Sequence, residues 1–165
     1  MSLLSSLGLN DVPSDPNDIP DGKYDGIVQA SEYVLVSSKN TLAHVVTYQV
    51  ADGEYKGAQK QVWNTLYKNV VDANNNFPDK IEDVKGGESS MSDANKRWYK
   101  KMWCDLLNLT DAEYGQREAN LKPEDLVGIP VTFGIKTKDG YKNVNFVERR
   151  MTEVPTAAAS GISAF

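Results

Sequence analysis

Apolar and polar residues alternate with a period of two along much of the chain, a pattern typical of β-strands with one buried face. The alternation runs through residues 23–37, 41–51 and 58–67. Gly26, inside the first of these segments, indicates a bend or bulge of the kind that small, strongly coiled barrels need. His44 belongs to the bulkier set of alternating residues in 41–51, and we therefore expect it to be a core residue.

The strongest turn signal is Asp139-Gly140, which lies between two further alternating segments. Asp-Gly as the central pair favours a type I′ turn, and such a turn fixes which residues of the two strands face each other. The predicted pairs are Lys138 with Tyr141, Lys136 with Asn143, Ile135 with Val144, Gly134 with Asn145, Phe133 with Phe146 and Thr132 with Val147.

This register gives the predicted hairpin two unlike faces. The apolar face, expected to point to the core, consists of Val131, Phe133, Ile135, Val144 and Phe146. The outward face consists of Thr132, Gly134, Lys136, Lys138, Tyr141, Asn143 and Asn145. Two lysines and an aromatic ring therefore share one solvent-facing surface of the hairpin.

Between the third strand and the hairpin, the pattern changes to a helical one. Residues 93–108 predict an amphipathic helix that begins after Ser92, a favoured N-cap residue. Its apolar arc consists of Trp98, Tyr99, Met102, Leu106 and Leu109. Residues 69–91 before the helix are polar and rich in Asn, Asp and Gly, which predicts a long connection. Thr110 begins a capping box for a second, short helix.

The order of these elements predicts a mainly β fold, a five-stranded OB-fold barrel with the amphipathic helix between strands three and four. An α+β sandwich built from the same elements remains the alternative. Residues 1–22 are acidic and rich in proline, so we expect a flexible acidic tail there. The folded domain is then 23–150, and residues 151–165 are expected to form a second flexible tail.

The distribution of charge matters more here than its total. The chain has 165 residues, the size of one domain, and a net charge of −5. Residues 1–22 hold four Asp and no Lys or Arg, whereas residues 126–150 hold five basic and two acidic residues. A local basic strip can bind phosphates even when the whole chain is acidic, because counterion release depends on local contacts.

Several classes of function are disfavoured by composition. The chain has one cysteine and one histidine, which excludes an intrachain disulfide and a Cys/His zinc cluster. It has no Gly-rich phosphate loop, and no nucleophile motif accompanies His44. We therefore expect a binding protein with no catalytic residues, metal or cofactor. The sequence shows no signal peptide and no membrane span, so we expect a cytoplasmic location and no membrane partner.

The predicted outer faces combine aromatic rings and cations, the two groups that bind single-stranded nucleic acid. Trp63 and Tyr67 lie two positions apart on the third strand, and we expect both to be exposed on one side; burial of Trp63 is the alternative. Candidate stacking residues are Trp63, Tyr67 and Tyr141, and candidate phosphate contacts are Lys136, Lys138, Lys142 and Arg149, with Asn143 beside them. A solvated strand face with no ligand is the competing interpretation.

Four runs of residues resemble parts of a known family. Ile19-Pro20-Asp21-Gly22-Lys23-Tyr24-Asp25-Gly26 opens the first strand, and Val50-Ala51-Asp52-Gly53-Glu54-Tyr55-Lys56-Gly57 forms the following hairpin. With Leu126-Val127-Gly128 and Asn143-Val144, these runs resemble a family of bacteriophage single-stranded DNA-binding proteins. The resemblance implies an OB-fold protein that coats single-stranded DNA in phage DNA replication or recombination, in the host cytoplasm. It also implies partner replication or recombination proteins that bind a tail; a homo-oligomer is compatible with the sequence.

Two other functions stay open at this stage. A non-catalytic protein-interaction or virion-assembly module with an OB-like barrel would suit an acidic chain with two tails. A metal-dependent nuclease would need its carboxylates brought together; the candidates are Asp79, Glu82, Asp83, Glu124 and Asp125. Nothing in the sequence orients these carboxylates as a metal site.

Overall fold

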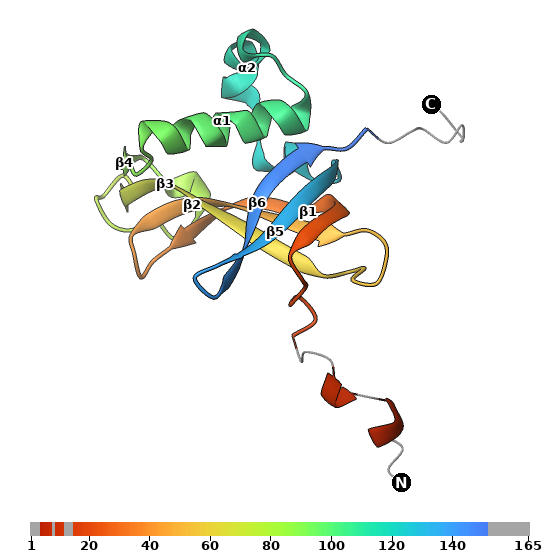
Figure 1. Ribbon diagram of the computed structural model, residues 1–165. Helices are drawn as coiled ribbons and strands as arrows, with labels where there is room; N and C mark the ends of the chain where they lie inside the picture. The colour runs from red at the N-terminus through yellow and green to blue at the C-terminus, as the bar shows by residue number, and fades with distance from the viewer. Residues whose placement is uncertain (1–3, 8, 12–14, 152–165) are drawn as a thin grey trace.

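The computed structural model describes residues 4–7, 9–11 and 15–151. Six antiparallel strands form one curled, half-barrel sheet in the order β4-β3-β2-β1-β5-β6, and the helices lie on one side of it (Figure 1). The strands are β1 (Gly22–Val36), β2 (Thr41–Val50), β3 (Gln59–Val71), β4 (Gly86–Ser89), β5 (Pro130–Lys138) and β6 (Tyr141–Arg149). The helices are α1 (Asp93–Leu107) and α2 (Asp111–Arg117), with short 3₁₀ turns η1 (Ser5–Leu7), η2 (Leu9–Asp11), η3 (Ile81–Asp83), η4 (Glu118–Asn120) and η5 (Pro123–Leu126).

The long strand β1 organises the sheet because it pairs with two neighbours. Its first part, from Gly22 to Ile27, pairs with β5, and most of its length pairs with β2. The register with β2 shifts between Val28 and Ala30, and Gly26 lies buried just before this irregularity. The expected bend or bulge in the first strand is confirmed.

Gly26 tolerates no side chain where it lies. A Cβ at this position would lie 2.7 Å from Cε1 of Phe133 and would overlap the carbonyl oxygen of Gln49. We expect Gly26→Ala to lower the free energy of unfolding by about 1–3 kcal/mol, measured by urea denaturation, because overpacking forces backbone and ring shifts. Gly115→Ala in α2 is the matched control: its Cβ would meet nothing within 4 Å, so its stability should stay equal or rise. Equal midpoints for the two variants would contradict this account.

The sheet curls far enough to bring β3 and β6 together. Cα atoms of the two strands approach within 8 Å, yet β3 and β6 are not hydrogen-bonded neighbours in the sheet order of the described chain. Helix α1 contributes Trp98, Tyr99 and Met102 over this line of approach, which we call the seam. The seam is where the half-barrel stays open.

The core fills the inside of the curl. Tyr48 stacks on Phe133 with 5.7 Å between ring centroids, and Trp103 and Leu106 of α1 are buried against them from above. His44 is fully buried and is bonded by Ser31 at Nε2 and by Tyr99 at Nδ1, both at 2.7 Å. The expectation of a core histidine is confirmed.

Two expectations about the region between β3 and the hairpin need correction. Five strands were expected, whereas the structure has a sixth, β4, inside the expected connection; it pairs with the free edge of β3. The helix was expected to bury Trp98, which is instead 69% exposed, while Trp103 is 3% exposed. At 100° per residue Tyr99, Trp103 and Leu106 form the centre of the buried stripe, and Trp98 falls at its border.

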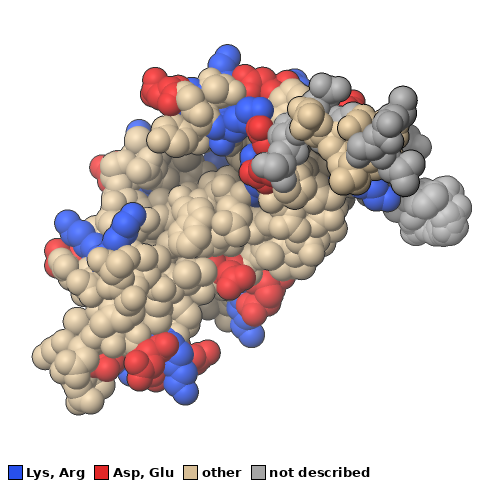
Figure 2. Space-filling model, turned by 90° about the horizontal axis from the view of Figure 1, so that it is seen from below, with Lys and Arg blue, Asp and Glu red and all other residues tan. Residues whose placement is uncertain are grey.

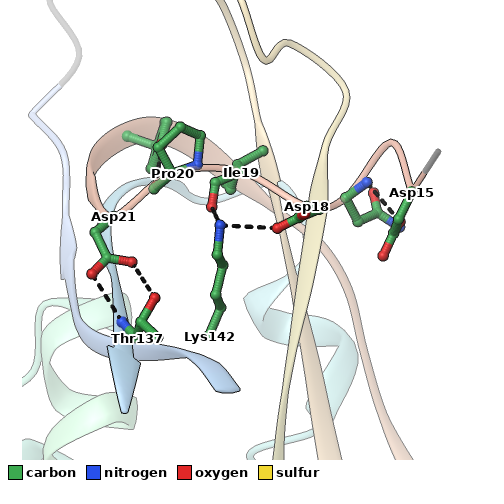
Figure 3. Close-up of polar contacts among 9 residues, drawn as sticks. Asp15, Asp18, Ile19, Pro20, Asp21, Thr137 and Lys142 are labelled. Carbon is green, nitrogen blue, oxygen red and sulfur yellow. Dashed lines mark hydrogen bonds and ion pairs between the residues drawn. The ribbon is translucent and has the colours of Figure 1, made fainter. Parts of the chain in front are cut away.

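The segment before β1 packs on the barrel (Figure 3). We call residues 15–21 the strap. Lys142 donates to Asp18 Oδ1 at 2.9 Å and to the carbonyl of Ile19 at 2.7 Å, while Asp21 accepts from both the amide and the hydroxyl of Thr137. Ile19 is fully buried in the core. The expected tail over 1–22 is therefore wrong for its last part, since one buried isoleucine and two polar anchors hold the strap in place.

Two further expectations concern the C-terminal tail and membrane-spanning segments. The expected tail over 151–165 lies outside the described residues except for Met151, which is exposed. None of the helices in the described part of the chain combines the length and the apolar composition that crossing a lipid bilayer requires.

Candidate nucleic-acid interface

The β5–β6 hairpin keeps its expected register near the turn and loses it further on. Lys138 faces Tyr141, Lys136 faces Asn143 and Ile135 faces Val144, as expected. A bulge at Asn145 then shifts the pairing. The observed partners beyond the bulge are Gly134 with Phe146, Phe133 with Val147 and Thr132 with Glu148, so the three pairs expected there are wrong. The turn signal fixes the register only up to the first inserted residue.

The bulge moves Phe146 from the core face to the outer face. Its ring lies against the bare Cα of Gly134, where a Cβ would come within 2.6 Å of Phe146 Cδ1. Lys23 of β1 places its Nζ 5.3 Å from the centroid of the same ring. Val147 takes the inner position against the core instead. The expectation that Phe146 faces the core is therefore wrong: its ring lies half-buried on the outer side of the hairpin, where it also lines the pocket along the seam.

The outer face of β1, β5 and β6 is built in successive rows across the three strands. Lys23, Gly134 and Phe146 form one row, Lys136 and Asn143 the next, and Lys138 and Tyr141 the last. All three lysines are exposed, and Tyr141 is 74% exposed. Three cations and two rings thus share one side of the ribbon.

Trp63 lies on the outer side of β3, opposite Val45, and is 53% exposed. Its neighbours Val62 and Asn64 point inward and, with Val144 and Val147 of β6, line a pocket of about 280 Å³ along the seam. Because side chains alternate along β3, Trp63 lies on the outer side of the seam. Phe146, paired with Gly134, reaches the seam from the side of β6 and lines the same pocket. We call the surface from Trp63 across the seam to the hairpin rows the outer platform.

Tyr67 lies on the opposite side of the sheet from Trp63. The pairing of β3 with β2 shifts between Thr65, which faces Ala43, and Tyr67, which faces Leu42, so Leu66 is an inserted residue. Tyr67 therefore points to the inner side, where it lines a cleft of about 720 Å³ beneath the helices. The expectation that Tyr67 and Trp63 share a face is wrong, because the inserted residue reverses the alternation beyond it.

Two of the four expected phosphate-binding cations are engaged inside the protein. Lys142 holds the strap, and its bond to Asp18 lowers the pKa of that carboxyl. Arg149 donates from Nη1 to the carbonyl of Leu106 at 2.9 Å, near the end of α1. Of the expected site residues, the structure brings Lys136, Lys138, Tyr141, Asn143 and Trp63 to the outer platform, and it leaves Tyr67, Lys142 and Arg149 elsewhere.

The position of Arg149 leads to a specific expectation. Arg149→Ala should lower the free energy of unfolding by about 1–2 kcal/mol, because the carbonyl of Leu106 loses a charged, partly buried donor. Thermal or urea denaturation measures this change. Lys138→Ala is the control: its side chain is exposed on the platform, so its stability should match that of the unmodified chain. If Arg149→Ala were as stable as that control, Arg149 would be left free for a ligand.

Two acidic residues offset part of the positive charge of the platform. Asp25 accepts from the hydroxyl of Thr132 at 3.0 Å, and Glu148 lies opposite Thr132 on β6. Figure 2 shows the face seen from below, where Lys and Arg occur in small separate groups, most of them beside Asp or Glu. A ligand on the outer platform would therefore be held by ring contacts at least as much as by charge, because Asp25 and Glu148 lie on the same side of the strands as the lysines.

The chain has one histidine and one cysteine, and burial opposes the charged form of each. Burial lowers the pKa of His44 to about 4 and raises the pKa of the Cys104 thiol, so neither a charged histidine nor a thiolate is favoured. Within residues 4–7, 9–11 and 15–151, no three His, Cys, Asp or Glu side chains come together as metal ligands. Asp125, one of the nuclease candidates, accepts from the amide of Lys122 and so caps the start of turn η5, in which it lies.

Comparison of the chain with protein-family models, with curated proteins and with solved structures gives no match.

Proposed function

We propose that this protein binds single-stranded DNA on the outer platform with little dependence on base sequence. The observation that carries the proposal is the shared outer side of Trp63, Phe146 and Tyr141 with Lys23, Lys136 and Lys138. Bases stack on exposed rings, at about 1–3 kcal/mol per base, and lysines meet the phosphates between them. Ring faces accept any base, so such a surface discriminates weakly among sequences.

We further propose that the half-barrel is an OB-fold. The supporting features are the three consecutive antiparallel strands, the helix between β3 and the final hairpin, and the pairing of β1 with both β2 and β5. OB-folds bind oligonucleotides on the face of their second and third strands and the loops beside it. Trp63 on β3 and the β5–β6 turn occupy comparable places. The resemblance of the four sequence runs is the basis on which we propose a role in phage DNA replication or recombination, in the host cytoplasm.

A titration with oligo-dT tests the binding proposal. Trp98 is exposed on α1 and Trp103 is buried, so a Trp98→Phe background leaves Trp63 as the exposed tryptophan of the described chain. We expect quenching of its fluorescence at low salt. The logarithm of the binding constant should fall with the logarithm of the salt concentration with a slope of about −2, for three phosphate contacts. The absence of both quenching and retention on single-stranded DNA-cellulose at low salt would refute the proposal.

Matched variants locate the site. Lys136→Ala with Lys138→Ala should weaken binding and reduce the salt slope by about 1.4, since each single-strand phosphate contact contributes about 0.7. Lys80→Ala with Lys85→Ala removes two exposed lysines from the segment between β3 and β4, and should leave both quantities unchanged. Equal losses in the two double variants would show that lysine number alone, and not the outer platform, determines affinity.

The second candidate is a non-catalytic protein-interaction or virion-assembly module. The mixed charges in Figure 2 favour it, because nucleic-acid surfaces are usually more strongly positive. The same column experiment separates the two functions: a protein-interaction module should pass through single-stranded DNA-cellulose at low salt.

A further inference from the structure

The cleft beneath the helices has apolar walls that are open to solvent. We call it the helix-side cleft; it holds about 720 Å³ between the inner side of the sheet, the segment before α1, and helices α1 and α2. Leu66, Ile81, Val84, Met91 and Leu121 line it, and all five are half-buried in a chain whose core residues are almost fully covered. Open apolar clefts of this size are typical of binding sites.

The N-terminal arm, residues 4–7 and 9–11, presents apolar side chains that the barrel does not cover. Leu4, Leu7 and Leu9 are 66%, 67% and 54% exposed. Leu4 and Leu7 are three residues apart around turn η1, a spacing that places side chains on the same side of a 3₁₀ turn. Three exposed leucines within six residues form an apolar patch of the kind that marks interaction sites.

The arm and the cleft lie on opposite sides of one molecule. Figure 1 shows turns η1 and η2 below the sheet and helices α1 and α2 above it. The strap fixes the chain at Asp18 and Asp21 to the β5–β6 hairpin, and Asn17 accepts from the amide of Gln59 at 2.8 Å. The arm of one copy is therefore directed away from its own cleft.

The two surfaces are also complementary in charge. Lys96, Lys100 and Glu118 form part of the wall of the cleft, and Nζ of Lys100 lies 3.7 Å from Oδ1 of Asp111. The arm ends at Asp11 and holds no Lys or Arg, whereas Asp18 and Asp21 of the strap are bound by Lys142 and Thr137 of their own chain. Leucines beside the carboxylate of Asp11 on one partner thus match apolar walls beside Lys96 on the other, an arrangement in which opposite charges meet across the contact.

We propose that the N-terminal arm of one copy docks in the helix-side cleft of a second copy. The leucines enter the apolar part of the cleft, and Asp11 at the end of the arm faces Lys96. The contact is head-to-tail, because different surfaces of the two copies meet, and it generates closed rings or open chains. This proposal does not depend on the binding of nucleic acid.

Sedimentation velocity over a range of micromolar concentrations tests it, with three variants. The arm variant carries Leu4→Ser, Leu7→Ser and Leu9→Ser; the cleft variant carries Met91→Glu and Lys96→Glu; Val127→Ser, another exposed apolar residue, is the control. We expect the unmodified chain and the control to self-associate alike. Each of the other two should weaken association at least about tenfold, because apolar burial or charge attraction is lost.

Mixing the variants gives the sharpest result. The arm variant keeps an intact cleft and the cleft variant keeps an intact arm, so an equimolar mixture should form a one-to-one dimer and nothing larger. A monomeric unmodified chain at all concentrations would overturn the proposal, as would an arm variant that associates like the unmodified chain. The arm substitutions lie at exposed positions outside the barrel, so they test the proposal even where the cleft variant fails to fold.

Discussion

A chain that lacks residues 1–20 should be less stable than one that lacks residues 1–14 by at least about 3 kcal/mol. The longer deletion removes Ile19, a fully buried isoleucine, and loss of such a side chain alone costs about 2–5 kcal/mol. It also removes Asp18 and the carbonyl that Lys142 contacts. For a domain of ordinary stability, about 5–15 kcal/mol in total, this is a large fraction.

Urea denaturation of the two truncated chains measures the difference. Ile19→Ala in the full chain is the matched control, and it should account for most of the loss because the ion pair of Lys142 with Asp18 is solvent-exposed and contributes little. If both truncated chains unfolded at the same urea concentration, the strap would make no contribution to the fold. A shortened chain made for binding experiments should therefore start at residue 15 and not at residue 23.

The stability of the protein should fall between pH 6.5 and pH 4. His44 has its pKa lowered by burial from 6.5 to about 4, so it is neutral in the folded protein and becomes protonated first in the unfolded one. Its contribution is fully present above pH 6.5 and decreases as the pH falls through this window, by up to about 3 kcal/mol. Both ring nitrogens already have hydroxyl partners, so the cost arises from charging a buried ring and not from a broken hydrogen bond.

Denaturation midpoints at a series of pH values measure this effect. His44→Gln keeps a polar side chain that does not titrate, so its stability should vary less over the same window. Asp18, Asp21 and Glu113 have lowered pKa values and lose their contributions at lower pH, so they affect both proteins equally. Parallel pH profiles for the two proteins would contradict the assignment.

Local signals in the sequence predicted most of the framework. The Asp139-Gly140 turn, the Ser92 cap and the two-residue alternation each depend on a few neighbouring residues, and the structure confirms the elements that they predict. His44 was placed correctly because its neighbours on the same face are large and apolar. The mainly β fold with a helix before the last hairpin follows from these elements alone.

The faces of Tyr67 and Phe146 could not be predicted in the same way. Each lies just beyond an inserted residue, Leu66 in β3 or Asn145 in β6. A single insertion reverses every later side chain, because the period of a strand is two. An inserted residue has no compositional signature of its own. The local sign in the sequence is Gly134, whose missing side chain leaves room for the ring of Phe146.

The strap was missed for a different reason. Its composition, acidic and rich in proline, is that of a segment that does not fold alone. Its burial depends on partners far along the chain, since Lys142 is 123 residues from Ile19 and Thr137 is 116 residues from Asp21. Lys142 and Arg149 were predicted to contact phosphates, because nothing near them in sequence indicates that they donate to backbone carbonyls of the protein itself.

The two sides of the β5–β6 hairpin have different neighbours. The hairpin therefore connects its outer face with the strap on its other side. Lys136, Lys138 and Tyr141 face outward, while Thr137 and Lys142 on the same two strands grip residues 18–21. If single-stranded DNA shifted the tip of the hairpin, the hydrogen bonds of Thr137 and Lys142 to residues 18–21 would also be strained. The amide of Thr137 donates a hydrogen bond to Asp21. Its rate of hydrogen exchange should therefore change when a ligand binds the outer face of the hairpin, even though the amide does not contact that ligand.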